Sequence, residues 1–233
     1  RLLEEVESSN VRRTIVRFYS WINPTVSLGR NQKKENAVDL EFCSEQGINV
    51  VYRPTGGRAV LHDDELTYAI ASNDGERFDG GSVYATYRRI SEAMTQGYRR
   101  LGVDVALAPD TKLRRRSPDG RDDPCFISPS RYELMFKGRK IAGSAQRQLR
   151  RGFLQHGSIL ITCNRELLAR ATRLTDQSIL NEEMAGVAEC LPERPSVDSM
   201  VSAFRAAFIE YFSIEFKLVN DFRVGSYWNC PPV

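Results

Sequence analysis

The feature that most constrains this chain is the stretch RPTGGRAVLHDDELTY, residues 53–68. It places a glycine pair, Gly56 and Gly57, after a proline turn and before a short apolar run. Glycine is favoured where the backbone takes positive φ or approaches a ligand closely, and backbone N–H groups suit a phosphate, a carboxylate or a developing oxyanion. Because Arg53 and Arg58 flank the pair, the stretch predicts an anion- or acyl-binding loop; a plain tight turn is the alternative. The spacing matches neither GxxxxGK[ST] nor GxGxxG.

His62 ends the apolar run that follows the glycines. A histidine at a strand end is most simply a structural hydrogen-bonding residue, and it is also a candidate for moving protons or holding the loop. The three acids of residues 63–65 are most simply a solvated turn. This turn predicts a hairpin between strands at 58–62 and 65–72.

Short β-branched segments are interleaved with a few helical ones along the rest of the chain. Further strand patterns occupy residues 11–20, 25–29, 48–53, 103–109 and 152–162, with a hairpin over 132–146, and helical spacing occupies residues 37–47, 82–102, 165–172 and 197–214. Strands that bunch and connect mostly through hairpins predict an α+β fold with a mixed, largely antiparallel central sheet flanked by helices. We expect one domain over residues 1–233, in which 195–233 supply a C-terminal helix and an edge strand at 215–219.

Composition excludes several classes of protein. Hydrophobic residues make up 41% of the 233 residues, which is enough for a packed core. The 33 basic and 30 acidic residues are too balanced to indicate nucleic-acid binding, and no apolar run approaches the roughly 18 residues of a membrane span. Five cysteines without a CxxC pair favour neither a disulfide framework nor a zinc site, so a reducing cytoplasm is the expected location.

A second unusual stretch is GRKIAGSAQ, residues 138–146. Lys140 lies there among small residues, which leave room on paired strands for a ligand. Its ammonium group suits an anion or a carbonyl oxygen, although a surface lysine on a hairpin is the ordinary alternative. His156 lies on the next strand, where a structural role is the default.

Cys125, in PCFISPS, follows a charged, apolar-poor segment at 111–124 that we expect to be a surface loop. Its neighbours Arg121 and Arg131 would lower the pKa of the thiol, and a thiolate can accept an acyl group. The remaining cysteines are Cys43, Cys163 and Cys190, which read as small core residues, and Cys230 near the end of the chain.

Taken together, these stretches resemble the superfamily of lipoate/biotin protein ligases and octanoyltransferases over about residues 15–165. Residues 53–68 are similar to its ligand loop, R-R-x-[ST]-G-G-[GR]-A-V-x-H-D. Residues 138–146 are similar to its catalytic-lysine strand, 154–161 to the strand that follows, and SLGRNQ at 27–32 to an earlier segment. The resemblance implies the α+β fold of class II aminoacyl-tRNA synthetase and biotin-protein-ligase catalytic cores.

Two features resemble the octanoyltransferases whose cysteine precedes a Pro-Ser turn. Arg58 stands where ligases usually carry a third glycine, and CFISPS is similar to A-C-F-x-x-P-S. The chain departs from the pattern at Tyr52, where the first arginine of a pair is usual, and at Pro124, where alanine is common. A weakened arginine pair fits a thioester donor better than ATP.

The resemblance implies that an octanoyl group passes from acyl carrier protein, through a thioester on Cys125, to one lysine of a lipoyl domain. The acceptor would be a protein such as the glycine cleavage H protein or a 2-oxoacid dehydrogenase E2. Lys140 would stabilise the acyl oxygen, without any metal or cofactor. The expected substrate-binding residues are Arg53, Gly56, Gly57, Arg58, His62, Gly143, Ser144, Ala145 and His156.

Two other functions are compatible with the same residues. One is a lipoate-protein ligase that uses ATP and Mg²⁺, and the other is a non-catalytic module that binds lipoyl domains or acyl groups. Neither nucleic acid nor a membrane is an expected partner. Basic clusters at 114–116 and 147–151 could steer acidic carrier proteins, although a solvated basic loop is the simpler reading.

Overall fold

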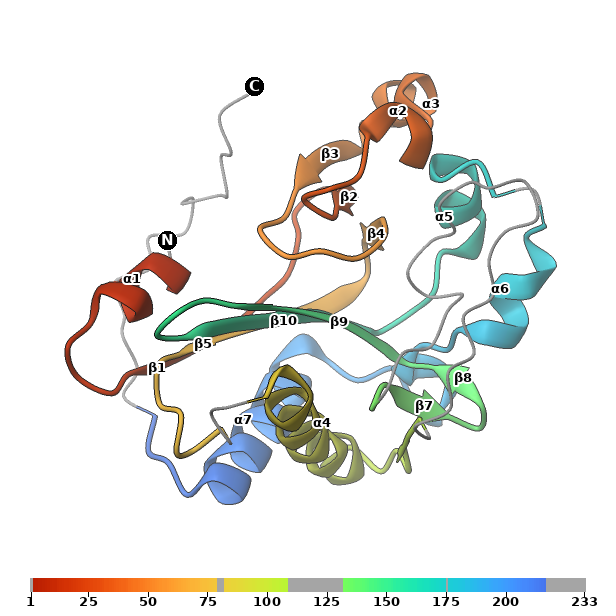
Figure 1. Cartoon of the computed structure of the whole chain (residues 1–233). Coiled ribbons are helices and arrows are strands. Elements are labelled where there is room, and N and C mark those ends of the chain that lie inside the picture. Colours follow the sequence, from red (N-terminus) through yellow and green to blue (C-terminus); the bar gives the residue numbers. More distant parts are fainter. Residues whose placement is uncertain (1, 79–81, 109–131, 175, 217–233) are drawn as a thin grey trace.

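The computed structural model describes residues 2–78, 82–108, 132–174 and 176–216 (Figure 1). Its central layer is a four-stranded antiparallel sheet in the order β1, β5, β10, β9. These strands are Thr14–Tyr19, Glu65–Ser72, Phe153–Leu160 and Ala142–Gln148, respectively. The expected α+β class with a largely antiparallel central sheet is confirmed.

Two long helices, α4 (Val83–Arg100) and α7 (Val197–Phe212), pack beneath this sheet (Figure 1). Strand β5 is buried along its whole length, and its successive side chains point to opposite faces. Leu66, Tyr68 and Ile70 belong to the core shared with both helices. On the opposite face of β5, Ala69 and Ala71 pack against the N-terminal helix α1 (Leu2–Ser8), whereas Glu65 at the start of the strand meets the second layer of the molecule.

That second layer is a three-stranded sheet above the central one (Figure 1). Strand β2 (Thr25–Leu28) lies between β3 (Asn49–Tyr52), which is parallel to it, and β4 (Val60–His62), which is antiparallel. Apolar residues of this sheet share a separate core with α3 (Leu40–Glu45) and α5 (Arg165–Ala171). The mixed pairing arises here, since the central sheet is antiparallel throughout.

The remaining elements are short. They are α1 (Leu2–Ser8), α2 (Lys34–Ala37), β6 (Ala106–Leu107), β7 (Leu134–Phe136), β8 (Arg139–Lys140), α6 (Ser178–Glu183) and the 3₁₀ helix η2 (Val187–Glu189). The sequence did not predict α2, α6 or η2, each of which is one to two turns long. The predicted hairpin over 132–146 is confirmed for β7 and β8, which are joined by Lys137 and Gly138, both with the positive φ that a type I′ turn requires.

The predicted hairpin between 58–62 and 65–72 is wrong. Strand β4 pairs with β2 in the upper sheet, whereas β5 pairs with β1 and β10 in the central one. The connection is anchored by Asp64, whose carbonyl accepts hydrogen bonds from the backbone of Ile161 (3.0 Å) and Thr162 (3.2 Å). These bonds direct the chain into the central sheet. As a result β4 and β5, two apolar strands separated by a polar turn, belong to different sheets.

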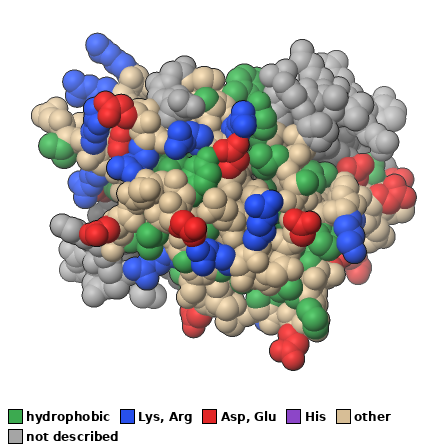
Figure 2. Space-filling view, turned by 90° about the horizontal axis from the view of Figure 1, so that it is seen from below, with side chains coloured by type: hydrophobic (Ala, Val, Ile, Leu, Met, Phe, Trp, Pro, Cys, Tyr) green, Lys and Arg blue, Asp and Glu red, His purple; other side chains and the backbone are tan. Residues whose placement is uncertain are grey.

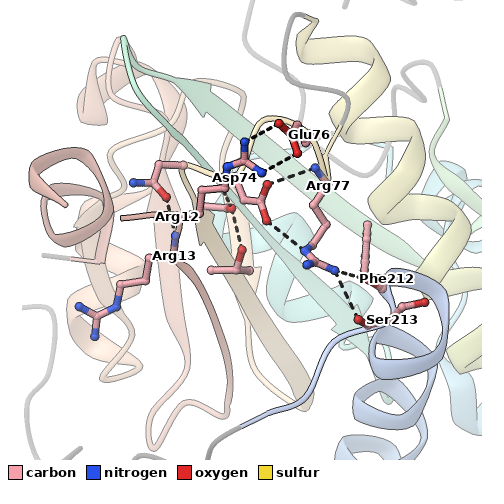
Figure 3. A network of polar contacts seen from close by, with 10 residues as sticks. Arg12, Arg13, Asp74, Glu76, Arg77, Phe212 and Ser213 are labelled. Atoms are coloured by element: carbon pink, nitrogen blue, oxygen red, sulfur yellow. Dashed lines mark hydrogen bonds and ion pairs between the residues drawn. The ribbon is translucent and has the colours of Figure 1, made fainter. Parts of the chain in front are cut away.

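Ionic contacts tie the end of α7 to the edge of the central sheet (Figure 3). Arg77 pairs with Asp74 at 3.1 Å and also donates to the carbonyl oxygen of Phe212, the last residue of α7. Next to this pair, Arg12 binds Glu76 through two hydrogen bonds. The loop after β5 is thereby held both to the segment before β1 and to the helical layer.

On the face seen in Figure 2, basic and acidic side chains are interspersed among apolar ones, and no patch of one sign spans the described residues. Within the described ranges, no helix combines the length and apolarity needed to cross a membrane. The predicted surface loop at 111–124 lies outside these ranges, as does most of the predicted edge strand at 215–219; residues 215 and 216 are not in a strand. A single domain over 1–233 stays a prediction.

Candidate active site

A mostly apolar cavity lies at the junction of the two sheets. The lining residues are Tyr19, Trp21, Ser27, Val51, Tyr52, Arg53, Pro54, His62, Ala69, Leu154 and His156. Three of the predicted site residues, Arg53, His62 and His156, thus meet around one mostly apolar space.

Arg53 fixes the glycine loop. Its Nη1 donates to the carbonyl of Ser27 (2.7 Å) and to Ser27 Oγ (3.2 Å), and its Nη2 donates to the carbonyls of Gly56 (3.0 Å) and Arg58 (2.7 Å). The side chain is mostly buried, so these bonds hold the loop against β2. A role in fixing the loop was not apparent from the sequence, which suggested a direct ligand for an anion.

The backbone conformation of the loop explains its glycines. Gly57 takes a φ of +97°, which disfavours residues with a Cβ. Gly29, at the end of β2, approaches the loop so closely that a Cβ there would lie 2.0 Å from the carbonyl oxygen of Gly57. Gly56, by contrast, borders open space, since an added Cβ would meet no atom within 4 Å. The loop therefore has one side packed on β2 and one side accessible.

His62 is held from both ring nitrogens and from one ring face. Its Nδ1 lies 2.7 Å from Glu65 Oε1, and its Nε2 lies 2.7 Å from Ser27 Oγ. Trp21 stacks on the ring at a centroid distance of 4.5 Å and an interplanar angle of 16°. The imidazole therefore has one fixed orientation at the wall of the cavity.

Glu65 corrects the expectation of a solvated acidic turn. Its side chain is buried and accepts hydrogen bonds from Thr67 and Ser158 in addition to its contact with His62. Asp64 pairs with Arg194 at 2.6 Å, and Asp63 accepts a bond from Asn164 at 3.3 Å. All three acids thus bind named partners, because the chain passes between two layers at this point.

His156 is neutral in the folded protein. Burial, together with the nearby positive charge of Arg53, lowers the pKa of its ring to about 3. Its Nε2 lies 2.7 Å from Thr55 Oγ1, a residue of the glycine loop. His156 therefore connects β10 to the loop without carrying charge near neutral pH.

The three small residues of β9 do not share one face. Gly143 pairs with Ser158 and Ala145 with His156, which places both on the face of the cavity. Ser144 points the other way, toward the helices, where its Oγ lies 2.8 Å from the hydroxyl of Tyr68. The expectation that Ser144 helps to wall the same slot is therefore corrected, because adjacent strand residues alternate between faces.

Lys140 is fully buried, and its Nζ lies 2.7 Å from Oε1 of Glu133, which is also buried. The prediction of an interior lysine is confirmed, and the surface-lysine alternative is wrong. Lys140 does not line the cavity described above. Lys140 lies on β8, two residues before the start of β9. The segment that carries this lysine therefore continues directly into β9.

The described cysteines are poor nucleophiles. Burial raises the pKa of Cys163 to about 12 and that of Cys190 to about 11, and it also raises the pKa of Cys43. These thiols are protonated at neutral pH, which agrees with their reading as core residues. Cys125, the predicted nucleophile, lies outside the described residues. Among the described residues no cluster of three His, Cys, Asp or Glu side chains could hold a metal ion.

Several residues of the site were missed from the sequence. Ser27, Trp21 and Glu65 lie close to residues that were singled out, but only the fold brings their side chains to His62. Two signals in the sequence could have indicated buried polar partners. Ser27 lies inside the apolar strand TVSL, and Glu65 begins the apolar strand ELTYAIAS. Glu133 had no such signal.

The fold and this site define a class of protein, and comparison with known families identifies it. The model of the lipoyl protein ligase A/B catalytic domain matches residues 1–209. The chain belongs to this family. Within it, the chain is of the octanoyltransferase type, and its relatives include octanoyltransferases LipM from three bacteria.

Identity to the LipM of Geobacillus kaustophilus is 39% over 213 residues, covering 88% of this chain and 76% of that protein. For Lysinibacillus sphaericus the identity is 37% over 214 residues (87% and 77% covered), and for Bacillus subtilis it is 36% over 203 residues (83% and 73% covered). The fold is similar to a lipoate-protein ligase A bound with ATP, with a TM-score of 0.73, 24% identity, and 93% and 81% of the two chains covered. A bipartite lipoate protein ligase from Thermoplasma acidophilum gives a TM-score of 0.69 at 24% identity, with 88% and 73% covered.

Proposed function

We propose that the protein is a protein N-octanoyltransferase that carries the acyl group on Cys125. The donor is octanoyl-acyl carrier protein, and the acceptor is the lysine of a lipoyl domain, such as that of a glycine cleavage H protein or a 2-oxoacid dehydrogenase E2. The observation that carries the proposal is the apolar cavity lined by Arg53 and Pro54, which precede the glycine pair, in a chain that is 36–39% identical to octanoyltransferases. These relatives favour transfer over ATP-dependent ligation.

The cavity suits a medium-length acyl chain. Ala69, Leu154 and Val51 provide aliphatic wall, and Tyr19 and Trp21 provide aromatic wall. Burial of about seven methylene groups at about 0.8 kcal/mol each gives at most about 5–6 kcal/mol. Such a difference separates octanoyl from much shorter acyl groups.

Lys140 is the proposed partner of the acyl carbonyl oxygen. A cation held in a dry interior stabilises a developing oxyanion more than the neutral ground-state carbonyl. Glu133 binds and orients this ammonium group in the resting protein. Backbone N–H groups near Gly56, Gly57 and Gly143 are the proposed additional donors, and Arg58 borders the same loop.

The proposed reaction has two steps. The Cys125 thiolate attacks the octanoyl thioester and the carrier thiol leaves, which forms a second thioester of similar energy. The lysine amine of the lipoyl domain then attacks this acyl-enzyme, and amide formation makes the sequence favourable. Neither step requires ATP or a metal ion. Cys125 precedes Glu133 by eight residues, so the proposed nucleophile is close in sequence to the partner of Lys140.

Intact-mass spectrometry tests the proposal directly. After mixing with octanoyl-acyl carrier protein without ATP, the protein should gain about 126 Da on the peptide that contains Cys125. Cys125→Ser should abolish this gain and the transfer to a lipoyl domain, whereas Cys190→Ser, the matched control, should preserve both. Activity only with lipoate and ATP would establish the lipoate-protein ligase alternative. Binding of a lipoyl domain without turnover would establish the alternative of a non-catalytic binding module.

A further inference from the structure

Ser27, His62 and Glu65 form an array that the proposed chemistry of Cys125 and Lys140 does not use. We propose that these three residues are a proton relay that accepts the proton of the primary amine attacking the acyl-enzyme. The inference rests on the proposed function and adds to it the route of the proton. All three side chains are buried, and Ser27 and His62 line the cavity.

The direction of the hydrogen bonds follows from the chemistry of the groups. An ionised carboxylate only accepts hydrogen bonds, so His62 Nδ1 carries the hydrogen that lies between it and Glu65. The neutral ring then has Nε2 as its acceptor, and the hydroxyl of Ser27 donates to it at 2.7 Å. Acyl-transfer enzymes move protons through the same order of groups: a hydroxyl, a base and a carboxylate that orients the base. Ser27, His62 and Glu65 supply these groups in that order.

Ser27 Oγ retains acceptor capacity toward the cavity. A hydroxyl oxygen accepts two hydrogen bonds, and among the described residues Arg53 Nη1 donates one of them at 3.2 Å. An N–H group of a substrate amine is a suitable donor for the remaining lone pair. The array can therefore bind an amine at one end and store its proton at the other.

The charges around the array favour this storage. Glu65 contacts one side of His62, and Arg53 contacts Ser27 on the other side. One anion and one cation therefore flank the imidazole in the resting state. His156, from β10, is neutral, and Tyr19 is protonated because burial raises its pKa. Imidazolium formation would then be stabilised mainly by Glu65, which already holds the ring by Nδ1.

In the proposed relay, the attacking lysine enters as an ammonium ion. Ser27 Oγ takes a proton from the lysine ammonium and passes its own to His62 Nε2, which forms an imidazolium next to Glu65. The freed amine attacks the thioester carbonyl, the C–N bond forms and the C–S bond breaks. The second proton of the amine goes to the departing Cys125 thiolate. His62 then returns its proton to solvent through the same hydroxyl.

Single-turnover kinetics separate the relay from its alternatives. Protein carrying octanoyl on Cys125 is mixed either with a lipoyl domain or with hydroxylamine, which is already a neutral nucleophile at pH 7. In Ser27→Ala and Glu65→Gln, the loss in acyl-enzyme formation and in hydroxylamine cleavage should be at least tenfold smaller than the loss in transfer to lysine. Transfer to lysine should fall by about 10²-fold, which is the usual contribution of a general base.

The pH profile and two further variants give independent readouts. The lysine transfer of both variants should recover as the pH rises toward the pKa of about 10.4 of a free lysine amine, since the base is then unnecessary. Ser27→Thr keeps the hydroxyl and should retain transfer. Ser72→Ala removes a buried hydroxyl at the far end of β5, where it contacts Thr14, and is the matched control.

Three results would overturn the relay. One is lysine transfer at the unaltered rate in Ser27→Ala or Glu65→Gln, and another is an equal loss of all three reactions with no recovery at high pH, which indicates a structural role. The third is octanoyl found on Ser27 in Cys125→Ser, which would make the serine a nucleophile. Absence of acyl-enzyme in the unaltered protein would instead overturn the proposed function, and the relay with it.

Discussion

Replacement of Lys140 by Met is the perturbation that best separates the folding role of this lysine from its catalytic role. The ammonium group is 0% exposed, its partner Glu133 is 3% exposed, and 2.7 Å separates Nζ from Oε1. Removal of one member of a buried ion pair costs about 3–5 kcal/mol, because a buried carboxylate loses its counter-charge. For a domain of this size each kcal/mol lowers Tm by about 2–4 °C, so Lys140→Met should melt about 6–20 °C lower.

The double variant Lys140→Met/Glu133→Gln is the decisive comparison. An amide in place of the carboxylate removes the buried charge, so the double variant should regain at least half of the lost stability in urea or thermal unfolding. Octanoyl transfer should be lost in both variants, because neither has a cation for the acyl oxygen. Arg88→Met, which breaks an exposed pair with Glu92, is the control and should change stability by less than about 1 kcal/mol.

Two results would refute this reasoning. If Lys140→Met unfolds within about 1 kcal/mol of the unaltered protein, the buried pair contributes little and the burial argument is wrong. If the stable double variant still transfers octanoyl at an unaltered rate, Lys140 does not stabilise the acyl oxygen.

Two further predictions follow from the glycine loop and from His156. Gly29→Ala should destabilise the protein by about 1–3 kcal/mol and impair transfer, because its Cβ would lie 2.0 Å from the carbonyl oxygen of Gly57; Gly56→Ala, which meets no atom within 4 Å, is the control for stability in urea unfolding. Equal unfolding midpoints for the two variants would contradict the close approach. The folded pKa of His156, about 3, lies below the unfolded value of about 6.5, so its contribution to stability is complete above pH 6.5 and is lost as the pH falls toward 3, by about 2 kcal/mol at pH 5. His156→Gln should flatten the fall in Tm between pH 6.5 and 5, and an unchanged slope would show that His156 is not the titrating group.

Much of this protein could be predicted from local patterns. The alternation in ELTYAIAS and the helical spacing of 82–102 and 197–214 identified the main strand and the two long helices, because backbone conformation and burial have short periods. The glycine loop and the interior lysine were also found, since residue types that suit a ligand cluster in those two stretches. Resemblance of the same stretches to a known family indicated the octanoyltransferase type.

Tertiary structure decided which of these groups meet. No local pattern shows that β4 and β5 belong to different sheets, because the choice depends on hydrogen bonds to the distant residues Ile161 and Thr162. That choice buries Glu65 beneath His62. Residue spacing along a chain sets conformation, whereas the partners of a buried charge are set by contacts between segments far apart in sequence. The sequence by itself therefore determined the elements and the family, and only the packing of the two sheets created the Ser27–His62–Glu65 array and the Lys140–Glu133 pair.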